Sequence, residues 1–396
     1  MTLASPRGPA KPTGKFARAL ERAWLSRGPI ALALRPVAWL YRLLLALRSA
    51  AYRVGLARSE RLPVPVIVVG NLITGGAGKT PTVVALVQAL RARGWQPGVI
   101  SRGFAGSATD VLEVTPDTPA THCGDEPLLL CLRTKAPVVV GRDRAAAGRA
   151  LLRAHPEVNV ILSDDGLQHL RLARDVQLIV FDERGVGNGW LLPAGPLREP
   201  FRAHPPARTL VLYNAPQATT HWPGRTVRRR LVGAVELADW WGGVAPTPAA
   251  LQALAGRPLV AAAGTARPQR FFDMLAAHGL TAQPLALPDH HDYTARAWPA
   301  DTTDVILTEK DAVKLPPGRV GKTRVWVAPL DFELDDALVD DIAALLPPPP
   351  RNDHGQPTAS TAGVPPVQGS AAASAPAAAR TPRTGVQRRS AGVSCA

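Results

Sequence analysis

Cysteine is scarce in this chain of 396 residues, which contains only Cys123, Cys131 and Cys395. So few cysteines, so unevenly placed, do not form the disulfide framework of a small secreted domain, and they suit a reducing compartment. Apolar residues make up 46% of the chain. That share is enough for a sizeable core and excludes wholesale disorder.

Acidic residues are also few, 31 against 46 lysines and arginines, which gives a net charge of +15. The excess lies at the two ends, because residues 1–62 carry a net charge of +10 and residues 347–396 carry +4. The stretch between them is nearly neutral. An enzyme acting on nucleic acid is expected to spread basic residues over its globular surface. The distribution therefore predicts no nucleic-acid partner.

A long uncharged apolar run is missing as well. The most apolar stretch, residues 30–47, is interrupted by Arg35, Pro36 and Arg42, whereas a membrane-spanning helix needs about 20 largely uncharged residues. At helical spacing, Arg35, Arg42 and Arg53 share one side, and apolar residues cover much of the rest. A basic amphipathic helix of this kind suits the surface of an anionic bilayer.

The preceding segment has a similar pattern, with Lys11, Lys15, Arg18 and Arg22 at helical spacing. We therefore predict that residues 1–62 form basic amphipathic helices at a membrane surface. Two other interpretations stay open. The segment could be an arginine-rich organelle transit peptide, or a helix that packs on the protein's own core.

Short β-branched runs separated by helical stretches begin at residue 64. The runs cover residues 64–70, 97–101, 137–141, 159–165, 176–182 and 209–214, with helices expected over 82–93 and 144–154. Apolar strands that alternate with helices are typical of a parallel sheet covered on both faces. We predict an α/β fold with a P-loop core over residues 63–232.

The alternation resumes at residue 258, which predicts a second, smaller α/β unit over residues 233–346. The last segment, residues 347–396, opens with four prolines and continues in alanine, serine, proline and glycine. It lacks the apolar periodicity that a core needs, so we predict a disordered basic tail.

Residues 64–81, VPVIVVGNLITGGAGKTP, read as a buried strand, a glycine-rich loop and the start of a helix. This order is typical of a P-loop that binds ATP, because its backbone N–H groups face phosphate oxygens at the positive end of the helix. Lys79 is expected to reach the β- and γ-phosphates, and the Thr80 hydroxyl to bind Mg²⁺. Ile73 stands where the usual motif has glycine, so the loop is a Gly-Gly-x-Gly-Lys-Thr variant. The predicted nucleotide-binding residues are Ile73, Thr74, Gly75, Gly76, Ala77, Gly78, Lys79 and Thr80.

A P-loop also needs a carboxylate for the metal, usually at the end of a neighbouring apolar strand. The run over 159–165 ends in Asp164 and Asp165, at the edge where open α/β sheets bind ligands. Two aspartates after a strand can also cap the next helix. Because the P-loop lies upstream, we predict that at least one of them has a metal role.

Two further clusters offer groups for proton transfer. CGDEP (123–127) puts Asp125 and Glu126 in a glycine-proline loop, and PDHHDYT (288–294) places His290 and His291 between two aspartates. The second cluster suits proton handling or metal ligation, but a polar surface turn has the same composition. The residues alone do not rank these candidates.

Several motifs, taken together and in order, resemble the tetraacyldisaccharide 4′-kinases of lipid A biosynthesis. They are VGNLITGGAGKTP, SRGF (101–104), GDEPLLL (124–130), SDDGLQH (163–169), LLPAGPLREP (191–200), GTARPQRFF (264–272), PDHHDYT and LTEKDAVKL (307–315). SDDGLQH and LLPAGPLREP are not general features of P-loop proteins, which makes the resemblance specific. Small departures occur at Phe104, Thr265 and Gln269, none of them at the expected chemistry.

This resemblance implies transfer of the γ-phosphate of ATP, with Mg²⁺, to the 4′-hydroxyl of an anionic glycolipid, tetraacyldisaccharide 1-phosphate. The reaction is implied to occur at the cytoplasmic face of the bacterial inner membrane, without an obligate protein partner. By motif, Asp125 is the general base, paired with His290, and His291 is the less favoured partner. The other implied site residues are Asp164 (metal), Asp165 and Glu199 (nucleotide), and His169 and Arg102 (substrate).

The best alternative is a membrane-associated ATPase that positions or partitions cargo. Such ATPases share Gly75 to Thr80 and an amphipathic helix, but they usually carry a second lysine where Thr74 stands. A nucleotide-gated membrane scaffold is a third possibility. Neither alternative accounts for the motifs around Asp125, Asp165 and His290.

Overall fold

The computed structural model describes residue 20, residues 22–104 and residues 106–347. The predicted tail therefore lies outside the described residues except for Pro347, as do Lys11, Lys15 and Arg18 of the first predicted helix.

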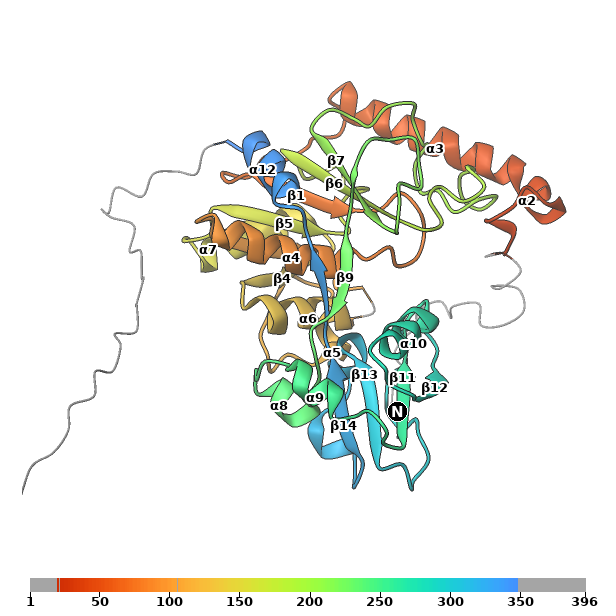
Figure 1. Ribbon diagram of the computed structural model, residues 1–396. Coiled ribbons are helices and arrows are strands. Elements are labelled where there is room, and N and C mark those ends of the chain that lie inside the picture. The colour runs from red at the N-terminus through yellow and green to blue at the C-terminus, as the bar shows by residue number, and fades with distance from the viewer. Residues whose placement is uncertain (1–19, 21, 105, 348–396) are drawn as a thin grey trace, which may run out of the picture. The chain divides into compact units, whose positions relative to one another are not determined.

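The larger sheet has eight strands in the order β3-β4-β2-β5-β1-β6-β7-β8 (Figure 1). Every neighbouring pair is parallel except β3 and β4, which are antiparallel. The parallel sheet predicted from the apolar runs is confirmed. Its strands are β1 (Val66–Gly70), β2 (Pro97–Ser101), β3 (Leu112–Val114), β4 (Val138–Val140), β5 (Val160–Asp164), β6 (Val176–Asp182), β7 (Thr209–Asn214) and β8 (Arg225–Thr226).

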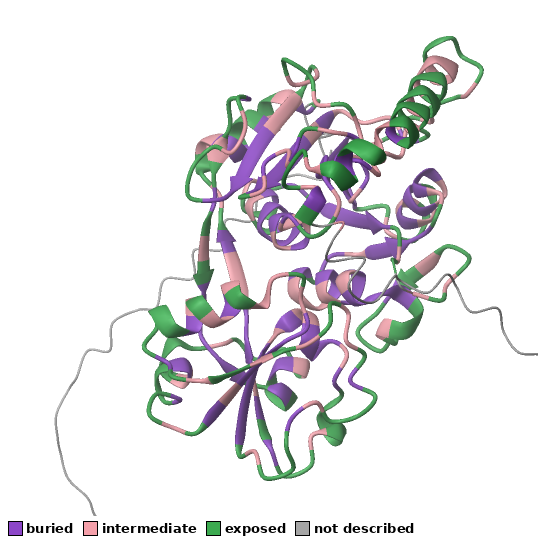
Figure 2. Ribbon diagram, turned by 90° about the vertical axis from the view of Figure 1, so that its right-hand side faces the viewer, coloured by how far each residue is buried: buried purple, intermediate pink, exposed green. Residues whose placement is uncertain are grey.

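Both faces of this sheet are covered, and for that reason its central strands are apolar at successive positions. In β1, Ile67 and Val69 pack in one core while Val66 and Val68 pack in the other, and the central strands are buried (Figure 2). The first core includes residues of α4 (Lys79–Ala92) and α6 (Asp125–Thr134). The second includes residues of α7 (Arg144–Ala154) and α3 (Arg35–Arg53).

Local signals set the ends of these helices. Helix α7 has the bounds that the sequence predicts, and the Asp143 carboxylate caps it by accepting from the N–H groups of Ala145 and Ala146. Helix α4 begins at Lys79, three residues earlier than predicted, because the P-loop leads straight into it. The short helix α5 (Ala120–Cys123) precedes α6.

A second sheet contains five strands in the order β10-β14-β13-β11-β12. It is parallel except for the edge pair β10 and β14. The strands are β10 (Val235–Glu236), β11 (Leu259–Ala263), β12 (Gln283–Ala286), β13 (Asp304–Thr308) and β14 (Arg324–Ala328). The helical segments between them are α8 (Leu237–Trp241), α9 (Pro248–Gln252), α10 (Pro268–Ala277), α11 (Glu309–Ala312) and η1 (Pro317–Arg319).

A two-stranded antiparallel ribbon connects the chain segments of the two sheets. Strand β9 (Arg228–Leu231) leads into the second sheet, and β15 (Leu330–Glu333) follows it and pairs with β9. The last described helix, α12 (Asp336–Leu345), then meets α4, where Arg93 pairs with Asp336 and Asp340. The helix that follows the second sheet in the chain thus contacts a helix that covers the first sheet.

The N-terminal helices α2 (Pro29–Ala33) and α3 pack on the core by one side only. Ala38 is buried, and the Tyr41 hydroxyl donates to the carbonyl of Arg198 at 3.0 Å. The opposite side exposes a row of large apolar residues, which we call the α2–α3 apolar surface. It consists of Ile30, Leu32, Val37, Trp39, Leu40, Leu43, Leu44 and Leu47. None of the described helices combines the length and apolar character needed to cross a bilayer.

Candidate active site

The glycine-rich loop adopts a conformation that only glycine takes easily at two positions. Gly75 has φ +89° and Gly78, the N-cap of α4, has φ +99°. Asn71 holds the loop from inside, since its side-chain amide donates to the carbonyls of Ile73 (2.7 Å) and Gly75 (3.1 Å) and accepts from Lys79 Nζ (3.1 Å). Sequence reasoning missed Asn71, although a polar residue directly after a buried strand was a usable signal.

The isoleucine at position 73 is explained by its surroundings. Its side chain is fully buried, and its backbone pairs with Leu197. The N–H of Thr74 donates to Pro196 O at 2.9 Å, and the N–H of Arg198 donates to Leu72 O at 2.7 Å. The segment LLPAGPLREP therefore forms one wall of the P-loop, and an apolar residue replaces the missing glycine.

The side chain of Asp164 is a buried carboxylate. It ends β5, paired with Val69 of β1, and neither of its oxygens has a hydrogen-bond partner among the described residues. Burial, aided by the charge of Glu126, raises the pKa of Asp164 to about 7. Thr80 is also buried, in the first turn of α4, which follows β1.

These two oxygen donors fit Mg²⁺, which takes one or two carboxylates and completes its shell with water and substrate phosphates. The described residues contain no cluster of three or more His, Cys, Asp or Glu side chains that could bind a metal by themselves. An uncompensated buried carboxylate beside a P-loop is the observation that supports the metal site.

Asp165 is in a different environment from its neighbour. Its backbone is left-handed (φ +49°), and its carboxylate lies 3.0 Å from Arg198 and 3.7 Å from Lys79. Burial acts to raise its pKa, but the charges of Lys79 and Arg198 outweigh this and hold the pKa of Asp165 below its usual range. Asp165 thus stays ionised and orients the P-loop lysine.

Asp125 and His290 lie 165 residues apart in sequence and in contact in space. Asp125 is the first residue of α6 and is buried, and its Oδ2 is 2.8 Å from His290 Nδ1. Burial alone would raise the pKa of Asp125, but the hydrogen bond from His290 and the charge of Lys310 lower it. His291, the other candidate, packs instead against the ring of Tyr293 at 4.8 Å.

Two lysines of the LTEKDAVKL motif complete this group. Lys310 Nζ lies 3.0 Å from Asp289 and 3.4 Å from His290 Nε2, and Lys314 Nζ lies 3.9 Å from Asp125. Neither lysine was predicted as a site residue. A lysine in a polar stretch resembles a solvated one, and only the packing of α11 against α6 brings these two to Asp125.

The P-loop and His290 line one cavity of about 480 Å³, and the buried Asp125 contacts it through His290. Its wall includes Gly75, Gly76, Gly78, Lys79 and Thr80 of the P-loop, together with His290, Lys310 and Glu126. Arg229, Arg267 and Arg270 also line it, and all three pair with Glu183. The cavity therefore joins a phosphate-binding loop, a positively charged wall and the imidazole of the Asp125–His290 pair.

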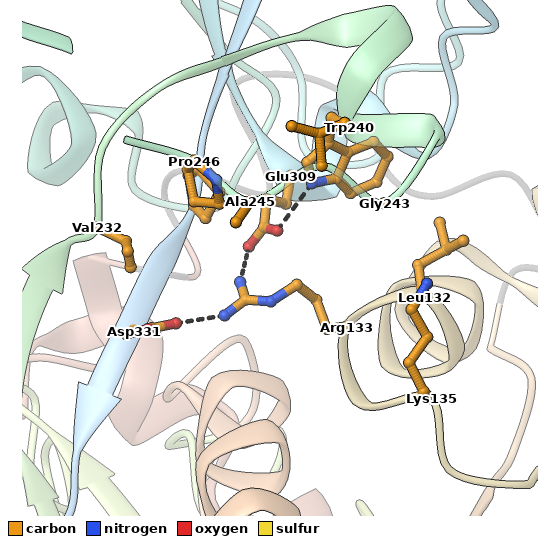
Figure 3. A pocket seen from close by; sticks show the side chains of 12 residues that line it. Leu132, Arg133, Lys135, Val232, Trp240, Gly243, Ala245, Pro246, Glu309 and Asp331 are labelled. Atoms are coloured by element: carbon orange, nitrogen blue, oxygen red, sulfur yellow. Dashed lines mark hydrogen bonds and ion pairs between the residues drawn. The ribbon is translucent and has the colours of Figure 1, made fainter. Parts of the chain in front are cut away.

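A smaller cavity of about 210 Å³ adjoins this region (Figure 3). Arg133 of α6 lies at its wall and pairs with both Glu309 of α11 and Asp331 of β15. The indole N–H of Trp240 donates to Glu309 at 3.1 Å. Arg133 and Glu309 also line the larger cavity, so this ion cluster forms the partition between the two.

Several predicted residues are not in the described wall of the larger cavity: Ile73, Thr74, Ala77, Asp125 and Asp164, and also Glu199, His169 and Arg102. Glu199 accepts from the Gln168 amide at 2.6 Å, whereas its neighbour Arg198 lines the cavity. His169 Nε2 accepts from the N–H of Arg144 at 3.3 Å, and burial lowers the pKa of His169 to about 4. Arg102 is exposed just beyond the end of β2.

Comparison with known proteins agrees with this arrangement. A model of the family described as tetraacyldisaccharide-1-P 4′-kinase matches residues 30–347. The tetraacyldisaccharide 4′-kinase of Methylibium petroleiphilum is 56% identical over 360 residues, which is 89% of this chain and all of that one. The enzyme of the same name from Leptothrix cholodnii is 54% identical over 84% of this chain and 97% of that one.

A solved structure is similar as well. The crystal structure of LpxK from Aquifex aeolicus, in complex with ATP, matches with a TM-score of 0.66 and 26% identity. The match covers 80% of this chain and 99% of that one. Together with the shared fold and the geometry of the P-loop, these matches show that the chain belongs to the tetraacyldisaccharide-1-P 4′-kinase family.

Proposed function

We propose that this protein transfers the γ-phosphate of ATP to the 4′-hydroxyl of tetraacyldisaccharide 1-phosphate, giving the 1,4′-bisphosphate. The proposal is supported mainly by one observation: the P-loop lines the same cavity as His290, whose ring contacts the buried Asp125 carboxylate at 2.8 Å. Phosphoryl transfer to an alcohol needs both a site that holds the phosphates and a group that accepts the hydroxyl proton. The family relationship favours this activity over that of a cargo-positioning ATPase.

The nucleotide side of the reaction is assigned to the P-loop. Backbone N–H groups of Gly75 to Gly78 bind phosphate oxygens at the positive end of α4, and Lys79 supplies a charge near the transferred group. Asp165 and Asn71 orient Lys79 through contacts of 3.7 and 3.1 Å. When bound, Mg²⁺ held by Asp164 and Thr80 supplies charge neutralisation for the phosphates.

The acceptor side is assigned to Asp125. The sugar oxygen forms a bond to the γ-phosphorus while the bond from phosphorus to the β–γ bridging oxygen breaks, and ADP leaves. The hydroxyl proton passes to the Asp125 carboxylate. Because the pKa of Asp125 is held low, the carboxylate is ionised and ready at neutral pH, and as a weak base it takes the proton late.

The membrane is the proposed source of the acceptor lipid. The α2–α3 apolar surface is suited to the interface of an anionic bilayer, where the exposed Arg42 and Arg53 of α3 would meet lipid headgroups. The acyl chains of the substrate stay in the bilayer while its sugars enter the cavity. The proposed location is the cytoplasmic face of the inner membrane.

The test is transfer of phosphate from labelled ATP to tetraacyldisaccharide 1-phosphate in mixed micelles. Lys79→Ala is expected to lose about 10²–10³-fold in rate and Asp125→Asn about 10²–10⁴-fold, while exposed Asp117→Asn serves as the matched control. Hydrolysis of ATP without lipid labelling would instead support the cargo-positioning ATPase. Full activity of Asp125→Asn would remove Asp125 from the mechanism.

A further inference from the structure

Lys310 occupies a position that the proposed chemistry has not yet used. It is the second residue of α11, and its side chain is mostly buried. Its ammonium group faces three partners: Asp289 at 3.0 Å, His290 Nε2 at 3.4 Å and Glu126 at 3.7 Å. Burial acts to lower the pKa of Lys310, but the charges of Glu126 and Asp289 raise it overall, so the group stays protonated.

The residue before it holds α11 in place. Glu309 is buried, and it accepts hydrogen bonds from Arg133 of α6 and from the indole N–H of Trp240 (Figure 3). Helix α6 carries Asp125 at its first residue and Arg133 two turns later. The Arg133–Glu309 pair therefore fixes the two helical segments that bring Lys310 and Asp125 to the same imidazole.

The chemistry of an ammonium group decides how His290 is protonated. A protonated lysine has three donors and no acceptor, so the Nε2 atom that faces it must accept and carries no proton. The proton of a neutral His290 is then on Nδ1, 2.8 Å from Asp125 Oδ2, where the N–H donates to the carboxylate.

We propose that Lys310 is a positioning residue that keeps His290 neutral, with its proton on Nδ1. Asp125 then accepts one fixed hydrogen bond from the imidazole at Oδ2, besides that from the Glu126 N–H at Oδ1, and keeps its remaining lone pairs for the substrate hydroxyl. This inference rests on the proposed function of Asp125. It adds a residue that acts on the base through His290.

Loss of Lys310 would change the charge around the imidazole. His290 would face the carboxylates of Asp125 and Asp289, the latter 3.7 Å from Nε2, with Glu126 close by. Lys314 remains, but its contacts are Asp125 and Asp311. Carboxylates favour the charged form of a histidine, so the ring would take up a second proton. An imidazolium bound to Asp125 makes this carboxylate a weaker base.

The ¹⁵N chemical shifts of the His290 ring, assigned by comparison with His290→Gln, test the proposal directly. The full-length wild type is expected to show one protonated nitrogen, Nδ1, at neutral pH. Lys310→Met is expected to show both nitrogens protonated, and Lys310→Arg to restore the wild-type pattern. Lys135→Met, which removes a lysine at the other end of α6, is the matched control. A proton on Nε2 in the wild type would overturn the proposal, whatever the variants do.

The pH dependence of kcat is the second readout. In Lys310→Met the acid limb is expected to move upward by about one pH unit, because His290 must first lose its extra proton. The rate at neutral pH falls by up to about tenfold and recovers in alkali, while KM for ATP is unchanged. If the acid limb of the kcat–pH profile does not shift in Lys310→Met and His290 stays neutral in that variant, Lys310 does not have the proposed role. Retained activity of Asp125→Asn, in contrast, would show that Asp125 is not the base. The NMR test of where the His290 proton lies does not depend on that result.

Discussion

The partition between the two cavities offers a prediction that can be worked out from the structure. Arg133 is 16% exposed and pairs with Glu309 (7% exposed) and Asp331 (29% exposed). Arg133→Met keeps a similar apolar stem but leaves both carboxylates without their cation. Removing one partner of a buried ion pair costs about 3–5 kcal/mol. The lower half of this range is expected, because Asp331 can regain water.

This cost converts into a shift of the melting temperature. An unfolding entropy of about 2.1 cal/mol/K per residue over roughly 330 residues gives about 4–7 °C for about 3–5 kcal/mol, if the described part unfolds cooperatively. Differential scanning fluorimetry measures this shift. Arg93→Met is the matched control, because its partners Asp336 and Asp340 are 91% and 67% exposed, and little change is expected.

The loss of stability in Arg133→Met is expected to depend on pH, and the sign of this dependence follows from Glu309. Burial raises its pKa against the opposing charge of Arg133, so the folded state binds its proton more tightly than the unfolded state. Without Arg133 the folded pKa rises further. The loss in the free energy of unfolding of Arg133→Met is therefore small below the pKa of Glu309 in the unfolded chain, about 4.3. It grows as the pH rises through the pKa of Glu309 in the folded variant.

Melting curves near pH 5 and pH 8 separate this explanation from a simple loss of packing. The deficit is expected to be larger at the higher pH, and Arg133→Met/Glu309→Gln is expected to recover part of it, since the double variant removes the buried charge. An equal deficit at both pH values, or no recovery in the double variant, would refute the reasoning.

Two other predictions concern the nucleotide site and the membrane. Gly78→Ala is expected to weaken ATP binding about tenfold or more, because Gly78 has φ +99° and a Cβ there would lie 2.4 Å from the Asn214 amide. Isothermal titration calorimetry measures this affinity. The control Gly318→Ala, where a Cβ meets nothing within 4 Å, is expected to bind ATP normally. Leu43→Ser/Leu47→Ser removes two residues that are 54% and 58% exposed. It is expected to lower binding to anionic vesicles about 10–30-fold, unlike Val111→Ser on another surface, and unchanged sedimentation with vesicles would argue against the membrane role.

The strands and helices of the first sheet could be predicted because their signals are local. Apolar runs bounded by glycine and polar residues gave the parallel sheet, and α7 has the predicted bounds. The P-loop was also readable, since a strand, a glycine-rich turn and a helix N-terminus follow one another within residues 64–81. The role of the α2–α3 segment stays a prediction, although its one-sided packing agrees with both a core contact and a free apolar surface.

The fold class, the phosphate-binding loop and the pair of aspartates after β5 could all be predicted from the chain alone, because each depends on residues that are neighbours in it. The tertiary structure decided which groups meet. It set Asn71 and Asp165 on Lys79, put Arg198 rather than Glu199 at the cavity, and brought Lys310 to His290. The physical reason is that these contacts depend on how helices and loops pack. A lysine 185 residues beyond Asp125 leaves no local pattern that shows it will share the same imidazole.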